Sequence, residues 1–191
     1  MAKLILIICI LISSRPIYAL EKCTFKLDPK FFKVGLNFYT DDERLEQKGY
    51  FSDVEIKGKL FGNSIRDIIK NLEIFIPYKN LNTYNTARDR MIYNYLLENE
   101  TDKQEFARVQ IKKLHPKKIH LNISINNISK DIVFKYDSRD VSMQSIGYID
   151  LKDFNLIKLK DSIEQKYDQK IWNDIFFDIR AKFDKKCINE L

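Results

Sequence analysis

The sequence has few of the residues that interrupt regular structure, with five glycines and four prolines among its 191 residues. Neither residue gathers into a run, and the chain has no repeat and no low-complexity tract. A flexible linker between domains needs such a tract. We therefore predict one domain after the amino-terminal segment described below.

Histidine and cysteine are also scarce, with two histidines and three cysteines. His115 precedes Pro116 in a basic turn, and His120 lies on the polar side of an alternating segment. Neither has a nucleophile or an acid at a meaningful spacing, and the chain has no G-x-S-x-G, C-x-x-C or H-E-x-x-H. We expect no catalytic residue, no metal site, no cofactor and no enzyme activity.

No apolar run is long enough to span a bilayer, which takes about 20 residues. The run at residues 4–12 follows Lys3 and ends in Ser13-Ser14-Arg15-Pro16, and Ala19 closes the segment. This order is typical of a secretory signal peptide, so we predict cleavage after Ala19, a mature domain of residues 20–191 and a periplasmic location. We do not expect an integral membrane protein.

The charge of the chain is moderate and mixed. The formal net charge is +6, and removal of Lys3 and Arg15 leaves +4, with both signs interspersed along the mature chain. Nucleic-acid binders usually concentrate their positive charge on one face or segment, so we expect no nucleic-acid partner.

Alternation of apolar and polar residues is the dominant pattern, and it is typical of half-buried strands. The clearest examples lie at residues 34–38, 54–56, 72–76, 119–125 and 175–183. Shorter strand candidates lie at residues 25–27, 106–111, 132–136 and 146–151. We predict a mainly β fold in which many sequential strands bury one face, as in a sandwich or a closed barrel.

Two segments differ from this pattern. Residues 86–97 predict a helix that Thr86 caps, with Met91 and Tyr95 one turn apart. Residues 161–169 predict a second helix or a charged loop.

The two cysteines of the mature chain, Cys23 and Cys187, lie near its two ends. They are two free thiols or one disulfide, and an exported protein meets an oxidising compartment. In a barrel with an even number of up-and-down strands, the first strand begins beside the end of the last. This arrangement favours the disulfide.

Five short pieces, in order, resemble the YceI-like family of exported bacterial proteins. The first is Phe25-Lys26-Leu27-Asp28-Pro29, followed by Gly49-Tyr50-Phe51. The third and strongest is Asn80-Leu81-Asn82-Thr83 with Arg88-Asp89. The last two lie at residues 125–132 and 149–154. Phe31-Phe32 and Thr40 stand where that family often has histidines.

The resemblance implies an extended, lipocalin-like antiparallel barrel of eight strands, with one or two short helices packed on it. It also implies an elongated apolar pore that holds a long-chain isoprenoid, quinone or fatty-acid-like ligand. We place these residues in the pore lining: Leu36, Phe38, Ile74, Ile76, Tyr84, Met91, Tyr95, Ile123, Ile125, Phe134, Ile149, Phe154, Ile175, Phe177 and Ile179. We place the polar residues Asn82, Arg88 and Asp89 at the pore mouth.

Three alternatives remain beside this hypothesis. The alternation also fits an outer-membrane barrel, although the amphipathic helix and the short polar connections disfavour it. A small barrel can instead be filled by its own side chains. The protein would then be an exported interaction or stress-related domain without a lipid. A homodimer is left open.

Overall fold

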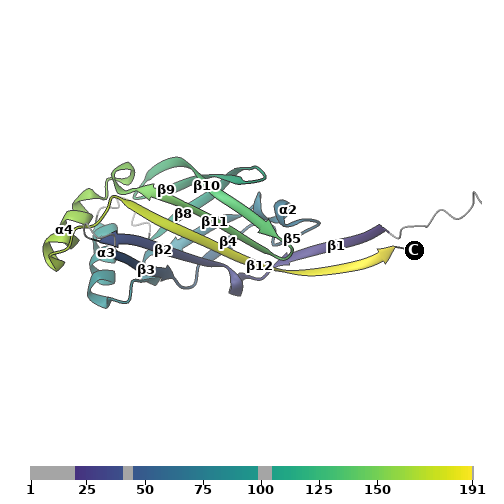
Figure 1. Cartoon of the computed structure of the whole chain (residues 1–191), viewed down its shortest axis with the longest axis horizontal. Helices are drawn as coiled ribbons and strands as arrows, with labels where there is room; N and C mark the ends of the chain where they lie inside the picture. The colour runs from purple at the N-terminus through teal and green to yellow at the C-terminus, as the bar shows by residue number, and fades with distance from the viewer. Residues whose placement is uncertain (1–19, 41–44, 99–104, 191) are drawn as a thin grey trace, which may run out of the picture.

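The computed structural model describes residues 20–40, 45–98 and 105–190 (Figure 1). The strands are β1 (Leu20–Leu27), β2 (Lys33–Thr40), β3 (Leu45–Phe51), β4 (Glu55–Lys57), β5 (Phe61–Gly62), β6 (Glu73–Pro77), β7 (Leu81–Asn82), β8 (Phe106–Leu114), β9 (Lys118–Ile125), β10 (Ile128–Arg139), β11 (Ser142–Asp150) and β12 (Asp174–Glu190). The helices are α2 (Ile65–Ile69), α3 (Thr86–Glu98) and α4 (Ile157–Tyr167), with short 3-10 turns η1 (Pro29–Phe31), η2 (Tyr78–Asn80) and η3 (Leu151–Phe154). The predicted signal segment lies outside the described residues.

The strands form where the sequence alternates. In β2, for example, Val34, Leu36 and Phe38 are buried on one face, while Lys33 is exposed on the other. All nine predicted strand segments coincide with strands, three of them starting or ending one residue outside the strand, and the mainly β, antiparallel fold is confirmed. The pattern missed β3, β5 and β7, because two of them have only two residues and β3 carries polar residues at most positions.

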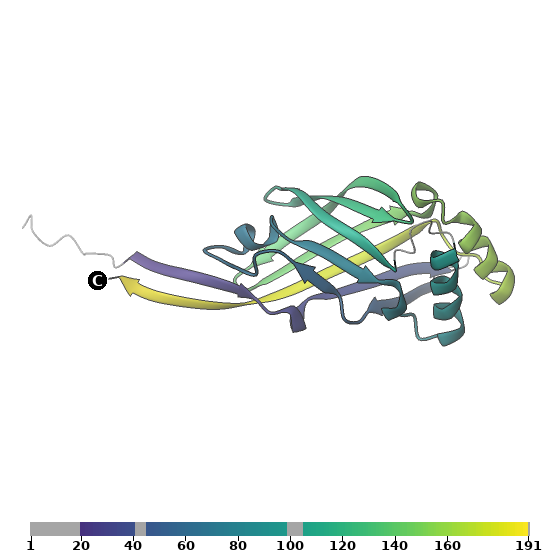
Figure 2. The same cartoon turned by 180° about the vertical axis from the view of Figure 1, so that it is seen from behind.

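The sheet is a curled, antiparallel half-barrel rather than a fully hydrogen-bonded cylinder (Figures 1 and 2). Its twelve described strands include the path β4-β6-β8-β9-β10-β11-β12-β2-β3-β7, in place of the eight strands predicted. Strands β4 and β7 end this path without pairing to each other in the described chain. Two connections cross the gap instead: the Ser52 N–H donates to the Asn80 carbonyl at 3.0 Å, and the Asn80 side chain donates to the Asp53 carbonyl at 3.3 Å.

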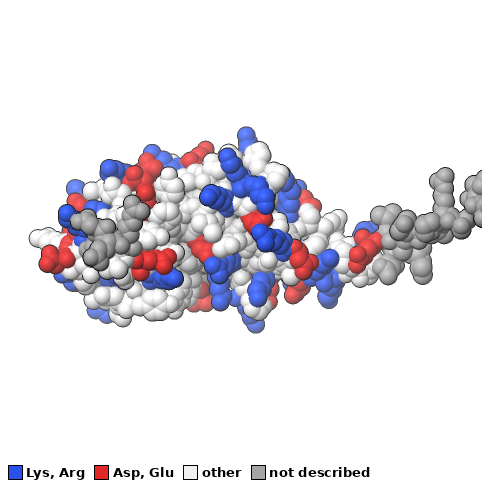
Figure 3. Space-filling model, viewed as in Figure 1, with Lys and Arg blue, Asp and Glu red and all other residues white. Residues whose placement is uncertain are grey.

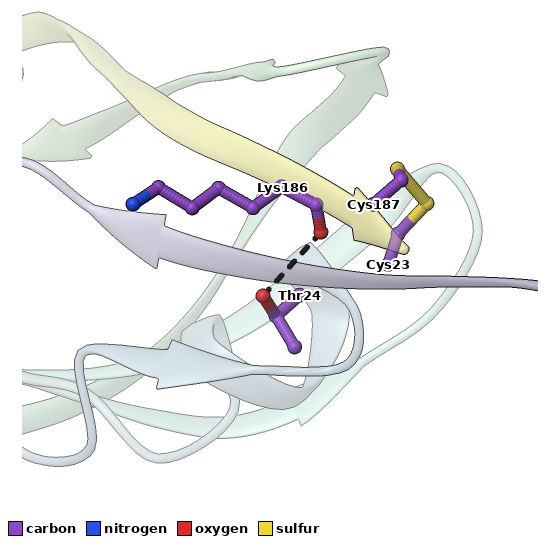
Figure 4. The surroundings of a disulfide bond; sticks show 4 residues. All are labelled: Cys23, Thr24, Lys186 and Cys187. Carbon is purple, nitrogen blue, oxygen red and sulfur yellow. Dashed lines mark hydrogen bonds between the residues drawn. A yellow bond between two sulfur atoms is a disulfide. The ribbon is translucent and has the colours of Figure 1, made fainter. Parts of the chain in front are cut away.

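The two ends of the described chain form a two-stranded ribbon that projects from the body of the molecule (Figures 1 and 2). Strands β1 and β12 pair antiparallel, and Cys23 faces Cys187 in their register. These cysteines form the predicted disulfide, 164 residues apart in sequence, and the Thr24 hydroxyl donates to the Lys186 carbonyl at 3.4 Å beside it (Figure 4). The disulfide therefore lies along this ribbon rather than at a barrel rim.

The helices lie at opposite ends of the sheet, with α3 and α4 at one end and α2 towards the ribbon (Figures 1 and 2). The predicted helix at residues 86–97 is confirmed as α3, but its cap is Asn85 rather than Thr86. The Asn85 side chain accepts the Arg88 N–H at 3.0 Å. The second predicted helix begins four residues earlier than expected, at Ile157, and ends at Tyr167. Helix α2 was not predicted.

The interior of the sheet is filled at the end near α2. Near α2 it is filled by fully buried apolar side chains, among them Leu27, Ile68 and Ile69. The side chain of Arg66 on α2 also donates to the Leu114 carbonyl, at the end of β8. Helix α2 therefore plugs the end from which the ribbon leaves.

The surface charges are mixed, as expected. Basic and acidic side chains are interspersed over the face drawn in Figure 3. Among the described residues, no helix has both the length and the apolar character that a membrane crossing requires.

Candidate functional site: an apolar cavity and its polar mouth

A cavity of about 180 Å³ lies inside the sheet and reaches the end where α3 and α4 pack. Predicted pore residues in its lining are Leu36, Phe38, Ile76, Ile123, Ile125, Phe134, Ile149, Ile175, Phe177 and Ile179. Residues not predicted are Val34, Phe51, Tyr78, Leu81, Thr83, Ile92, Leu96, Ala107, Val109, Leu121, Leu151, Leu156, Leu159, Lys160, Ile163 and Ile171. Arg88 completes the lining. A volume of this size would hold roughly a dozen water molecules, yet the wall offers water few polar partners.

Five residues predicted for the pore lie elsewhere. Helix α3 presents Arg88, Ile92 and Leu96 to the cavity, each one turn after the last. Met91 and Tyr95 each precede one of these residues by one position, so they lie beside the face that lines the cavity. Both instead pack partly buried against the core. The remaining three are Ile74, which is buried in the filled core, Phe154, which is fully buried in η3, and Tyr84, which is exposed at the surface.

Thr83 fixes the start of α3 to the sheet. Asp89 accepts the Thr83 N–H at 3.0 and 3.2 Å and the Thr83 hydroxyl at 2.5 Å. Thr83 is buried, with 4% of its surface exposed. Gly49 lies directly behind it on β3, where an added Cβ would come within 2.9 Å of the Asn82 carbonyl. The Asp89 carboxylate thus has a structural role, because its oxygens are engaged by Thr83.

Arg88 stands at the end of the cavity. Its Nε donates to the Thr83 hydroxyl at 2.8 Å, and its Nη2 donates to the Thr83 carbonyl at 2.7 Å. The guanidinium carbon lies 4.9 Å from the centre of the Phe38 ring, which belongs to the cavity wall. Burial lowers the pKa of Arg88, and the charges of Asp89 and Tyr167 oppose that lowering.

A second, polar hollow adjoins the cavity on the outside. It has a volume of about 410 Å³ and is lined by Gln47, Lys48, Thr83, Tyr84, Asn85, Arg88, Tyr167 and Gln169. Thr83 and Arg88 belong to both linings, so the apolar cavity meets the polar surface at these two residues. This junction is the mouth of the cavity.

The segment before α3 shapes one side of the mouth. Tyr84 has a φ of 60°, in the left-handed region that a bulky residue rarely adopts. The Asn82 side chain holds this turn, because its oxygen accepts the Tyr84 N–H at 2.8 Å while its nitrogen donates to the Tyr50 hydroxyl at 3.0 Å. The turn leaves the Tyr84 ring 77% exposed beside the hollow.

Helix α4 supplies a second cation to the cavity wall, but this one is paired. The Lys160 ammonium lies 2.9 Å from the Glu164 carboxylate, and the two side chains are 15% and 23% exposed. The carboxylate also accepts the Ile171 N–H at 2.6 Å. Burial would raise the pKa of Glu164, but these hydrogen bonds and the Lys160 charge outweigh it and lower the pKa. Lys160 therefore closes the wall with its stem while its charge is neutralised.

Comparison with known proteins identifies the fold. No family model and no curated protein matches the sequence. Solved structures do match it. A polyisoprenoid-binding domain from Saccharophagus degradans is 11% identical and aligns over 85% of this chain and 98% of its own, with a TM-score of 0.61. BcnA of Burkholderia cenocepacia is 10% identical and aligns over 81% of this chain and 98% of its own, with a TM-score of 0.58. A mutant of the Campylobacter jejuni YceI protein is 20% identical and aligns over 75% of this chain and 84% of its own, with a TM-score of 0.51. The chain has the YceI-like fold.

The YceI-like fold gives the strongest of the five sequence pieces a physical role. Asn82, Thr83, Arg88 and Asp89 are brought together at the mouth, where they hold the turn, anchor α3 and end the cavity. Val109 and Leu121 share the alternation of the predicted residues, so the sequence carried a signal for them. The charge of residues 157–167 hid Leu159 and Ile163, which lie one turn apart on the buried face of α4.

Proposed function

We propose that this protein is an exported carrier that holds the chain of a long amphiphile, such as an isoprenoid, a quinone or a fatty acid, in its apolar cavity. The cavity itself is the observation that carries the proposal. A preformed apolar volume with a few polar groups at one end is the usual form of a small-molecule site. Each buried methylene would contribute about 0.8 kcal/mol to binding.

Two further observations support the proposal. One of the proteins that share the fold is named for polyisoprenoid binding. The disulfide between Cys23 and Cys187 suits the oxidising compartment that the amino-terminal segment predicts. Both observations support our proposal of a periplasmic location.

The first test is to export the protein into a periplasm, purify it without detergent, and measure its mass by native mass spectrometry with solvent extraction of bound lipid. We expect about one long-chain molecule per protein. An empty protein, both as purified and after incubation with isoprenoid, quinone and fatty-acid chains, would refute the carrier. It would instead favour the interaction domain, whose partner binds the outer surface.

Two variants make this test specific to the cavity. Ala107→Phe places an apolar ring in the cavity and should weaken uptake of long chains, leaving room only for shorter ones, while the fold stays intact. Phe177→Asp puts an unpaired carboxylate into the same wall and should abolish uptake or folding. The control is Asp178→Ala on the opposite face of β12, where the carboxylate pairs with Arg180. This change should alter neither uptake nor folding.

A further inference from the structure

The mouth carries a cation that the described chain leaves without an ion-pair partner. No carboxylate among the described residues lies within ion-pair distance of the Arg88 guanidinium, although Lys160, Lys48 and seven other cations have one. The neighbouring Asp89 directs its oxygens to Thr83. Two of the guanidinium nitrogens bind Thr83, and no described residue accepts from the third.

A residue that lines the same hollow carries a buried hydroxyl. The Tyr167 oxygen, at the end of α4, is buried and makes no hydrogen bond to any described residue. Leaving a buried donor unsatisfied is costly, and such groups in native proteins need an explanation. Tyr167 and Arg88 both belong to the lining of this hollow. A ligand oxygen between the two would satisfy both.

The other groups around the hollow also favour a negatively charged ligand. Asn85 caps α3, so the positive end of the helix dipole faces the hollow. Lys48 also lines it, and its partner Glu46 is not part of the lining. Among the described residues of the lining, none is acidic.

From these contacts we infer that the mouth selects amphiphiles with an anionic oxygen head group, a phosphate or a carboxylate, which Arg88 and the Tyr167 hydroxyl bind while the chain fills the cavity. The inference rests on the carrier function proposed above and adds the class of head group. Charge-assisted hydrogen bonds are about twice as strong as neutral ones, and a guanidinium matches both oxyanions geometrically.

The test compares four probes that share a twelve-carbon chain: dodecyl phosphate, dodecanoate, 1-dodecanol and dodecyltrimethylammonium. Their dissociation constants are measured by calorimetry on delipidated protein. We expect at least one anion to bind about tenfold or more tighter than the alcohol, and the cation to bind weakest. Tighter binding of the phosphate would point to a phosphorylated isoprenoid as the source of the head, and tighter binding of dodecanoate to a fatty acid.

Tyr167→Phe is the decisive variant because it removes a hydroxyl that makes no hydrogen bond to the described residues. The melting temperature should stay the same or rise, while the preferred anion should bind about fivefold to tenfold more weakly. Binding of 1-dodecanol should stay within twofold of the unmodified protein. If Tyr167 had a purely structural role, its replacement would not weaken anion binding while leaving both the melting temperature and alcohol binding unchanged.

Arg88→Met should abolish the preference for anions, and Arg88→Lys should restore part of it. Equal affinity of the unmodified protein for the alcohol and both anions would refute the head-group inference and leave the carrier function standing. An anion preference that survives both Tyr167→Phe and Arg88→Met would also refute it. If no probe binds, including the alcohol, the carrier function fails as well.

Discussion

Gly147 lies directly beneath the ring of Phe134 in the wall of the cavity. An added Cβ would lie 2.0 to 2.5 Å from three atoms of that ring, which is far inside van der Waals contact. Phe134 is 1% exposed, so the ring has little room to move except into the cavity. The glycine on β11 and the ring on β10 thus form one close-packed unit.

Gly147→Ala should therefore destabilise the protein by about 1–3 kcal/mol and reduce chain binding, because the displaced ring enters the cavity. Urea unfolding and a titration with dodecanol measure the two effects. Gly35→Ala is the matched control, because its Cβ would meet the Asp178 carbonyl at an ordinary 3.6 Å. If the two variants behave alike, the packing of Phe134 on Gly147 does not define the cavity wall.

At the level of single residues, alternation predicted much of the cavity wall, whereas Asn82, Arg88 and Asp89 at the mouth were predicted from the family resemblance. Alternation places Leu36, Ile123 and Phe177 on the inner face without any knowledge of the fold. It cannot show that Arg88 joins two hollows or that the Tyr167 hydroxyl has no partner among the described residues. Both facts depend on how α3 and α4 pack together at the end of the sheet, and side-chain periodicity carries no information on that.

Among the elements, the disulfide-linked ribbon of β1 and β12 is far from the mouth. The cavity contacts α3 and α4, whereas the ribbon leaves the opposite end, behind the buried plug of α2 (Figure 2). The bond between Cys23 and Cys187 spans 164 residues, so it restricts nearly the whole described chain in the unfolded state. We infer that it stabilises the fold and takes no part in ligand binding.

Replacing both cysteines by serine should lower the free energy of unfolding by up to about 5 kcal/mol in the chain-entropy model. The affinity for dodecanol should change by less than about twofold under conditions where the variant is folded. Chemical denaturation and calorimetry measure the two quantities, with Thr24→Ala as the control that leaves the bond intact. A large loss of affinity in the folded variant would show that the ribbon and the cavity are coupled.

The sequence predicted the long elements and missed the short ones. Alternating segments such as residues 119–125 form strands because one of their faces must be buried. The turn at Asn126 and Asn127, both at positive φ, then sets the β9–β10 hairpin. By contrast, α2 has five residues, and its helical form depends on the Ser64 cap and on burial of Ile65, Ile68 and Ile69. Tertiary packing decides such a segment, and the local pattern does not.

For the whole molecule, the resemblance to YceI-like proteins predicted the fold correctly but not its closure. The prediction of eight strands treated the barrel as a continuous hydrogen-bonded ring. Instead, β4 and β7 do not pair in the described chain, and the connecting segments that contain Ser52 and Asn80 bridge the gap between them. Short polar connections of this kind carry no periodic signal, so the sequence could not reveal the gap.

The fold also explains why the molecule is hollow at one end and filled at the other. Strand β12 runs the full length, with Ile175 and Phe177 in the cavity wall and Phe183 in the filled core. Helix α2 fills the space near Phe183, whereas α3 and α4 cover the other end without filling it. A bound chain would therefore enter beside Arg88 and end within the sheet.

A series of straight-chain alcohols from six to eighteen carbons, titrated into delipidated protein by calorimetry, tests the cavity most directly. If the cavity holds the chain, affinity should rise roughly fourfold with each added methylene and stop rising at the length that fills the cavity. Ala107→Phe should move that limit to a shorter chain. Affinity that is absent, or that does not change with chain length, would contradict the account.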